Sequence, residues 1–228
     1  MVKAVIFDLD DTLISEKQYI ISGYHHIAQV MHNRFKISEK EAFWELMKLF
    51  KESPKNVFNR FLDRYKIIYT KEIILNLVEE YRNHFPEICF YEDVLPCLAK
   101  LKSNNVKVGI ITDGYVNAQR QKMRAVKAYD YFDEVIITEE LGRKYWKPHP
   151  KAFEIMREKL DVEFNEMVYI GDNPEKDFYI GKKYPITTVR VLREGVYKDK
   201  AYLEDIKETY VINDLNEISL LITSPVDA

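Results

Sequence analysis

The chain has 228 residues, of which 46% are hydrophobic and 31% are charged, a composition typical of soluble globular proteins rather than of disordered ones. Its formal net charge of -3, with both signs mixed along the chain, argues against a nucleic-acid polymer as a partner, and no apolar stretch reaches membrane-spanning length. The two cysteines, Cys89 and Cys97, fit neither a disulfide framework nor a zinc site, so we expect a cytoplasmic protein without a membrane partner.

Short apolar runs that are typical of buried strands recur along the chain. The first is Ala4–Phe7, and it stops abruptly at Asp8. The later runs cover residues 106–112, 135–138, 167–171, 187–191 and, more weakly, 210–212. Helix-like segments separate most of them, at residues 116–127, 150–160 and 175–183. This alternation predicts an α/β fold, with a Rossmann-like, mostly parallel sheet and helices on both faces.

Residues 17–85 interrupt the alternation with segments that look helical throughout. Ser38 and Glu41 have the spacing of a capping box at the start of one helix. A second helix is expected from Thr70, with an apolar stripe formed by Ile73, Ile74, Leu77, Val78, Tyr81 and Phe85. We therefore predict a catalytic core of residues 1–16 and 86–228, with residues 17–85 inserted as a helical cap.

Two aspartates, Asp8 and Asp10, stand where the first strand ends. Alternate residues of a strand point to the same side, and ligands of doubly wound sheets bind beyond the carboxyl ends of the strands. Because neighbouring carboxylates repel each other, this pair favours a site for a hard cation such as Mg²⁺. Asp-x-Asp is also common in solvated turns, so the pair alone does not establish a site.

Three later segments carry groups that suit phosphate or metal binding. Thr112-Asp113-Gly114 can donate hydroxyl and backbone N–H groups to phosphate oxygens, and Lys147 can neutralise charge on a transferring group. Asp172 and Asp177 place two carboxylates around a tight turn. Taken singly, these segments are equally compatible with ordinary turns and a solvated lysine.

In their order, the four segments resemble the signatures of the haloacid dehalogenase (HAD) superfamily: Asp-x-Asp-x-Thr, a strand-end Thr or Ser, a Lys, and Gly-Asp-x-x-x-x-Asp. The resemblance implies a Rossmann-like core. An insertion between the first and second signatures is similar to the subclass with a helical, C1-type cap. The short stretches Asp-Asp-Thr and Lys-Pro-His-Pro resemble the nucleotidase and acylneuraminate-phosphatase branch.

This resemblance implies Mg²⁺-dependent hydrolysis of a small phosphomonoester, such as a sugar phosphate, a nucleotide or a phosphorylated acid. Asp8 would be the nucleophile that forms an aspartyl-phosphate, and Asp10 would act as acid and base. Mg²⁺ would be bound by Asp8, the Asp10 carbonyl and Asp172, with Asp177 in the outer shell. The phosphate would be held by Thr112, Asp113, Gly114 and Lys147.

Some positions depart from the superfamily pattern or leave a choice open. Asp10 favours a phosphatase over a dehalogenase, because family members that cleave carbon–halogen bonds lack this acid. Asp11 stands where many relatives have Gly and Asp113 where many have Asn, and either carboxylate could point away from the site. Arg143 and Lys144 are close enough in sequence to compete for the role of the motif lysine.

Substrate contacts are expected from the cap. Glu16, Gln18 and Tyr19 adjoin its first hinge and are candidate contacts, although hinge polar groups are usually solvated. His25 and His26 follow within two helical turns and could also touch a substrate, but a pair of histidines on a helix lies more often at the surface. A set of aromatic residues could form a slot for a base or simply the core of the cap: Phe43, Trp44, Phe50, Phe58, Phe61 and Tyr65.

Two other classes of protein share parts of this pattern. A signalling receiver domain also accepts phosphate on a strand-end aspartate beside Mg²⁺, but the helical insertion and Asp10 argue against it. A non-catalytic scaffold of the same fold is disfavoured by the four intact signatures.

Overall fold

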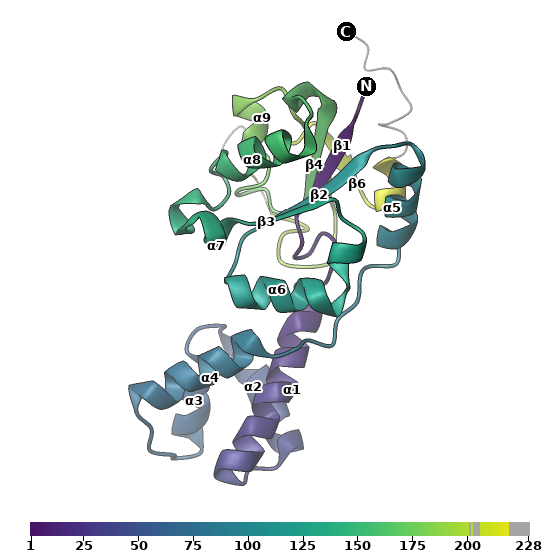
Figure 1. The fold of residues 1–228 in the computed structure, drawn as a ribbon. Helices are drawn as coiled ribbons and strands as arrows, with labels where there is room; N and C mark the ends of the chain where they lie inside the picture. The colour runs from purple at the N-terminus through teal and green to yellow at the C-terminus, as the bar shows by residue number, and fades with distance from the viewer. Residues whose placement is uncertain (201, 203–205, 219–228) are drawn as a thin grey trace.

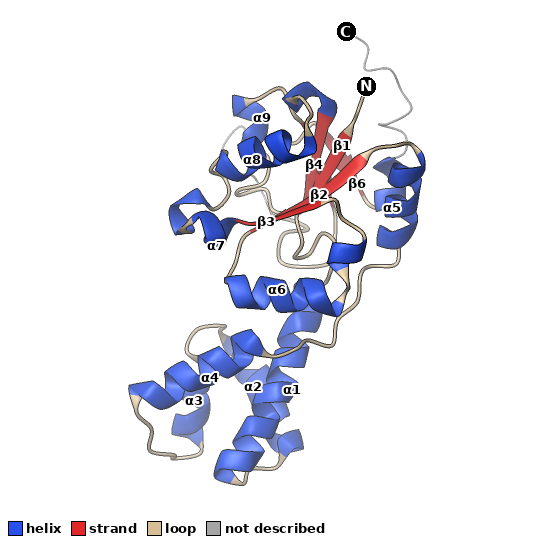
Figure 2. Ribbon diagram, in the orientation of Figure 1, coloured by secondary structure: helices blue, strands red, loops and turns tan. Residues whose placement is uncertain are grey.

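The computed structural model of the chain describes residues 1–200, 202 and 206–218. Six strands form one sheet in the order β3-β2-β1-β4-β5-β6, and every neighbouring pair is parallel. Their bounds are β1 Ala4–Phe7, β2 Lys107–Thr112, β3 Glu134–Ile137, β4 Met167–Gly171, β5 Thr187–Val191 and β6 Tyr210–Ile212. The predicted α/β fold with a parallel sheet is therefore confirmed, and β1 lies between β2 and β4 (Figure 2).

Helices cover both faces of the sheet, because successive residues of each buried strand point to opposite sides. In β1, Val5 and Phe7 belong to one apolar cluster, and Ala4 and Ile6 belong to the other. The first cluster includes side chains of α5 (Val94–Ser103) and α6 (Val116–Ala125). The second includes side chains of α8 (Lys151–Leu160) and α9 (Ile180–Lys183), while the short α7 (Thr138–Leu141) follows β3.

Four of the five helices between β1 and β2 form a separate block with its own apolar cluster. They are α1 (Glu16–Phe35), α2 (Glu39–Glu52), α3 (Val57–Arg64) and α4 (Lys71–Asn83). Figure 1 shows β1 running from the N-terminus towards this block, so the carboxyl ends of the parallel strands face it. The chain enters and leaves the block side by side, where Ile14 and Phe90 form an antiparallel bridge. The domain boundaries at residues 16 and 86 stay a prediction.

The ends of two cap helices differ from the expected pattern. The helix that starts after Thr70 ends at Asn83, and Phe85 is 65% exposed rather than part of the buried stripe. The reason is Pro86, since the residue before a proline is disfavoured in helical conformation. The helix after Ser38 begins as predicted, but the Ser38 side chain makes no capping hydrogen bond.

The helix predicted for residues 175–183 is reduced to α9, which begins only at Ile180. A turn occupies the first part of this segment, where the Asn173 carbonyl accepts hydrogen bonds from the backbone N–H groups of Lys176 and Asp177. None of the helices in the described part of the chain combines the length and the apolar character that a bilayer crossing requires.

Candidate active site

The carboxyl ends of three neighbouring strands bring the predicted site residues together. Asp8 follows β1, Thr112 ends β2 and Asp172 follows β4, and β1 lies between the other two strands. All three side chains are buried. Since ligands of such sheets bind beyond the carboxyl ends of the strands, the fold itself places these groups in a binding position.

Lys147 lies at the centre of this group, with its side chain completely buried. Its Nζ is 2.9 Å from Oδ1 of Asp8 and 2.9 Å from Oδ1 of Asp177, and it donates a hydrogen bond to the Tyr169 hydroxyl at 2.8 Å. Burial by itself would lower the pKa of the ammonium group, but Asp177 and Asp8 outweigh it and raise that pKa. Lys147 is therefore a permanent positive charge beside Asp8.

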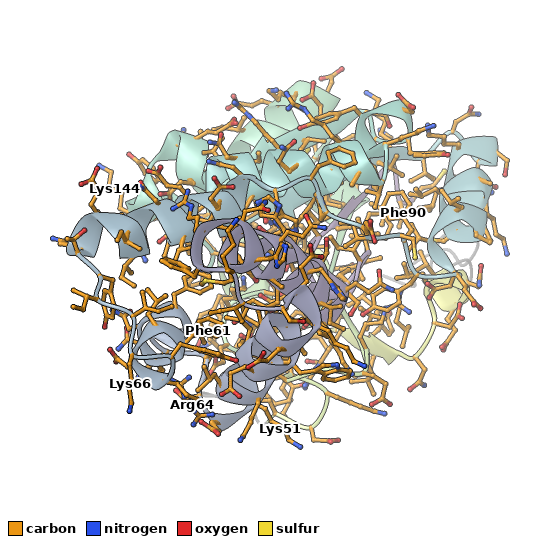
Figure 3. All side chains as sticks on the ribbon, turned by 90° about the horizontal axis from the view of Figure 1, so that it is seen from below. Lys51, Phe61, Arg64, Lys66, Phe90 and Lys144 are labelled. Atoms are coloured by element: carbon orange, nitrogen blue, oxygen red, sulfur yellow. The ribbon has the colours of Figure 1, made fainter. Side chains whose placement is uncertain are left out.

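The two other basic residues that were candidates for this position, Arg143 and Lys144, lie away from it. Both are exposed, with the Arg143 guanidinium 5.2 Å from the centroid of the Trp146 ring and the Lys144 ammonium 4.9 Å from that of Tyr145. Figure 3 shows Lys144 at the edge of the molecule. Only Lys147 of these three basic residues contacts the carboxylates of the site.

Three buried carboxylates, those of Asp8, Asp172 and Asp177, have oxygen atoms within 4.8 Å of one another. Burial is the main cause that raises the pKa of Asp172 to about 9, and repulsion from Asp177 and Asp8 adds to it. Burial likewise raises the pKa of Asp8 to about 6, against the attraction of Lys147. Carboxylate oxygens are the ligands that hard divalent cations prefer, so this cluster fits such an ion.

Asp177 is fixed more tightly than the other two carboxylates. Its Oδ1 contacts Lys147, and its Oδ2 accepts a hydrogen bond from the Asn173 backbone N–H at 3.0 Å. The close packing of the Asp177 side chain against the backbone of residue 171 requires a glycine there, because a Cβ atom at Gly171 would stand 2.4 Å from Asp177 Oδ2. With both oxygens already engaged, Asp177 suits a position in the outer shell of a bound cation, and this role stays a prediction.

Asp113 holds the loops around the site. Its Oδ1 accepts hydrogen bonds from the Thr138 hydroxyl at 2.7 Å and from the Lys147 backbone N–H at 3.1 Å, and its Oδ2 lies 3.1 Å from Lys176 Nζ. Burial opposes ionisation, but Lys147 and Lys176 outweigh it and lower the pKa of this carboxyl. Because both oxygens are engaged, a phosphate would meet backbone rather than carboxylate here. The next residue, Gly114, has a φ of 133° that only glycine adopts readily.

Asp11 has a left-handed backbone conformation, with a φ of 50°. Asp tolerates this region better than most residues do, which explains how it can stand where the superfamily signature usually carries Gly. Its Oδ1 accepts a hydrogen bond from the Glu16 backbone N–H at 2.9 Å, so the carboxylate supports the start of α1.

Asp10 contacts two residues of α6 that the sequence analysis did not identify. Lys122 Nζ lies 2.7 Å from its Oδ1, and Gln119 Nε2 lies 2.9 Å from its Oδ2. The same amide nitrogen is 2.6 Å from the Thr112 hydroxyl. A polar pair three residues apart on a helix that follows Thr-Asp-Gly is the only signal in the sequence that could have pointed to them.

A cavity of about 520 Å³ separates these groups from the helical block. Glu16, Tyr19 and Arg82 line it from the block, and Asp10 and Lys122 line it from the core. Glu16 as a residue is exposed, but the cavity walls desolvate its carboxyl group; this desolvation, followed by repulsion from Asp10, raises its pKa to about 7.

Of the remaining residues that were candidate substrate contacts, some line the cavity and others do not. Gln18 does not line the cavity, because its Oε1 accepts a hydrogen bond from the Cys89 backbone N–H at 3.2 Å. Of the aromatic set, Phe50 and Phe58 line the cavity, whereas Phe61 is completely buried in the cap core and Trp44 is 63% exposed beside a neighbouring cleft.

The two histidines do not line the cavity. The His25 ring stacks on that of Phe43, with the centroids 3.8 Å apart, and His26 Nε2 lies 2.9 Å from a carboxylate oxygen of Glu80.

Comparisons with a family model, with known proteins and with solved structures agree with one another. The model of the haloacid dehalogenase-like hydrolase family matches residues 5–191. A glyceraldehyde 3-phosphate phosphatase from Methanocaldococcus jannaschii is 31% identical over 223 residues, 96% of either protein, and a pyrophosphatase from Bacillus anthracis is 25% identical over 97% of each chain. The solved structure of a HAD phosphatase from Thermococcus onnurineus superposes with a TM-score of 0.63 at 28% identity, covering 97% of this chain and 98% of that one.

Proposed function

The chain belongs to the haloacid dehalogenase-like hydrolases and is a phosphatase of that family, and from this premise we propose that it hydrolyses a small phosphomonoester through an aspartyl-phosphate on Asp8. The observation that carries the proposal is the buried pair of Asp8 and Lys147 at the carboxyl edge of the sheet, beside Asp172 and Thr112. Such a pair keeps a nucleophilic carboxylate ionised and supplies positive charge where the phosphoryl group arrives.

Asp8 is oriented for attack by its own contacts. Within the described residues, the Leu9 backbone N–H at 2.8 Å and Lys147 at 2.9 Å both engage Oδ1. We therefore assign the attack on phosphorus to Oδ2. Lys147, the Thr112 hydroxyl and the backbone around Gly114 are placed to hold the phosphoryl oxygens while the bond to the leaving oxygen breaks.

Asp10 completes both halves of the reaction as a proton carrier. It gives a proton to the leaving oxygen as the bond between phosphorus and that oxygen breaks. In the second half it takes a proton from water, whose oxygen bonds to phosphorus while the Asp8–phosphorus bond breaks. Inorganic phosphate leaves, and Asp8 is free again.

The cation of this site is proposed to be Mg²⁺, held by Asp8, the Asp10 carbonyl and Asp172, with Asp177 behind them. The three clustered carboxylates support this, because one buried ammonium does not balance their charge. When bound, Mg²⁺ would offset negative charge between the nucleophile and the phosphoryl group.

Mg²⁺ is expected to stabilise the protein more at high pH than at low pH. The pKa of Asp172 is raised from 3.8 to about 9, so in chelator the folded state keeps a proton that the unfolded state loses, and stability falls as pH rises through this window. Melting temperatures in chelator should therefore fall between about pH 6 and about pH 8, and the gain on adding Mg²⁺ should be larger at the higher pH. Asp172→Asn is the matched variant. An equal Mg²⁺ gain at both pH values in the unmodified protein would contradict the assignment.

Asp10→Asn should keep Mg²⁺ binding but lower turnover by roughly 10²- to 10⁴-fold, the usual contribution of general acid–base catalysis. The backbone carbonyl is unchanged, and the amide can still contact Gln119, so the fold should be retained. Steady-state kinetics and a Mg²⁺-dependent melting shift measure the two effects separately. Undiminished turnover would remove Asp10 from the proton transfers.

We propose a short sugar phosphate as the substrate, with glyceraldehyde 3-phosphate as the first candidate, because a relative that is 31% identical along almost the whole chain carries that activity. Glu16 and Arg82 line the same cavity as Asp113 and Gly114, which belong to the proposed phosphate site, and they are candidate partners for a polar leaving group. We place the enzyme in the cytoplasm, a proposal that the free thiols of Cys89 and Cys97 support.

The test is a panel of phosphate esters ranked by kcat/KM in Mg²⁺, with and without chelator. It should include glyceraldehyde 3-phosphate, a phosphorylated acid, a nucleoside monophosphate and pyrophosphate, the last because of the second relative. We expect glyceraldehyde 3-phosphate to rank first and chelator to abolish all activity. A flat profile would argue for a broad phosphatase, and first rank for pyrophosphate would replace the substrate class.

A further inference from the structure

One face of α6 holds both carboxylate oxygens of Asp10. Lys122 Nζ lies 2.7 Å from Oδ1, and Gln119 Nε2 lies 2.9 Å from Oδ2. Gln119 is also 2.6 Å from the hydroxyl of Thr112, so one amide links the proposed proton carrier to the proposed phosphate-binding group. The orientation of Asp10 is thus set from α6, and not by its own loop alone.

These two side chains are buried where an apolar residue would be the simpler choice. Gln119 is 1% exposed, and the side chain of Lys122 is 6% exposed. The ring of Tyr19, from the cap helix α1, lies over the Lys122 ammonium with its centroid 4.3 Å away. Burying an ammonium group is costly, and a buried ion pair adds little stability compared with apolar packing. Stability therefore does not explain the pair, whereas control of Asp10 does.

We propose that Lys122 and Gln119 are positioning residues for Asp10, an inference that rests on the function proposed above. They hold the carboxylate at the cavity wall in one orientation, so that it reaches the leaving oxygen in the first half of the reaction and water in the second. Neither residue transfers a proton itself. Loss of either contact should slow the steps that need Asp10 while leaving the attack by Asp8 intact.

The test separates the two halves of the reaction in Lys122→Met, which keeps the length of the side chain and removes the charge. With p-nitrophenyl phosphate the leaving group departs without a proton, so the aspartyl-phosphate should still form quickly and then accumulate. Rapid mixing should show a burst of about one p-nitrophenol per chain, as expected for an accumulating covalent intermediate. The steady-state kcat should fall roughly 10- to 100-fold, part of the contribution of acid–base catalysis, and KM should fall with it, because kcat/KM reports the formation of the intermediate and that step is unchanged. With an alkyl phosphate the loss should be larger, and no burst should appear.

Three further variants make the result decisive. Lys122→Arg should recover most of the turnover, because it restores the charge. Gln119→Leu should show the same burst, and it serves if Lys122→Met does not fold. Arg124→Met, on the exposed side of the same helix, should behave like the unmodified enzyme. Unchanged turnover in the folded variants, or a loss without a burst on p-nitrophenyl phosphate, would overturn the inference. Failure of the unmodified protein to hydrolyse any ester would instead overturn the proposed function.

Discussion

Asp8→Asn is expected to lower phosphatase turnover on the order of 10⁴-fold or more, because the amide cannot form the covalent intermediate and no neighbouring carboxylate takes its place. Of the other carboxylates near it, Asp172 is assigned to the proposed cation site and Asp177 contacts Lys147. Lys147 keeps Asp177 as its partner in the variant, so the fold should persist. Steady-state assays with p-nitrophenyl phosphate, and trapping of the phosphorylated chain by mass spectrometry, measure the effect.

The matched control for this change is Asp161→Asn. Asp161 is exposed and has a left-handed backbone conformation that asparagine also adopts, so neither activity nor stability should change. Full activity in Asp8→Asn, or a phosphorylated residue elsewhere in the chain, would remove Asp8 from the mechanism.

Lys147→Met should reduce both activity and stability. It leaves Asp8 and Asp177 buried without their common cation, which costs about 3–5 kcal/mol when one partner of a buried pair is removed. Loss of its positive charge from the phosphoryl site should lower turnover by roughly 10²- to 10³-fold. Chemical denaturation in chelator measures the first effect, and added Mg²⁺ should recover part of the stability.

Lys144→Met is the control, because this lysine is exposed and only three positions away. It should match the unmodified enzyme in both measurements. If Lys144→Met lost activity while Lys147→Met kept it, the assignment of the motif lysine would be reversed.

The sheet was predictable because its strands are short apolar runs that stop at polar residues. The helix α5 was not predicted, although Val94, Leu98 and Leu101 share its buried side. It contains Pro96, and its N-cap residue Asp93 makes no capping hydrogen bond with the helix. Asp93 instead accepts hydrogen bonds from Arg193 and from the Leu215 backbone N–H, so the start of α5 is stabilised by contacts distant in sequence.

The residues of the candidate site likewise fall into those that local sequence motifs predict and those that depend on contacts distant in sequence. Residues that belong to motifs at strand ends, such as Asp8, Lys147 and Asp172, could be predicted because the topology gathers strand ends at one edge. Gln119 and Lys122 could not, since they reach Asp10 across more than 100 positions and only the rotation of α6 shows which of its side chains face the site.

The bridge between Ile14 and Phe90 has a consequence for how such enzymes diversify. The helical block leaves and rejoins the core at adjacent points. The strands of the sheet can therefore pair in the same way whatever the length of chain between these points. The helical block can therefore be replaced by another insertion, through recombination or design, without a change at the carboxyl edge of the sheet. With the function proposed above, substrate preference would then be inherited from the residues between the two bridge positions, and the chemistry from the strands on either side.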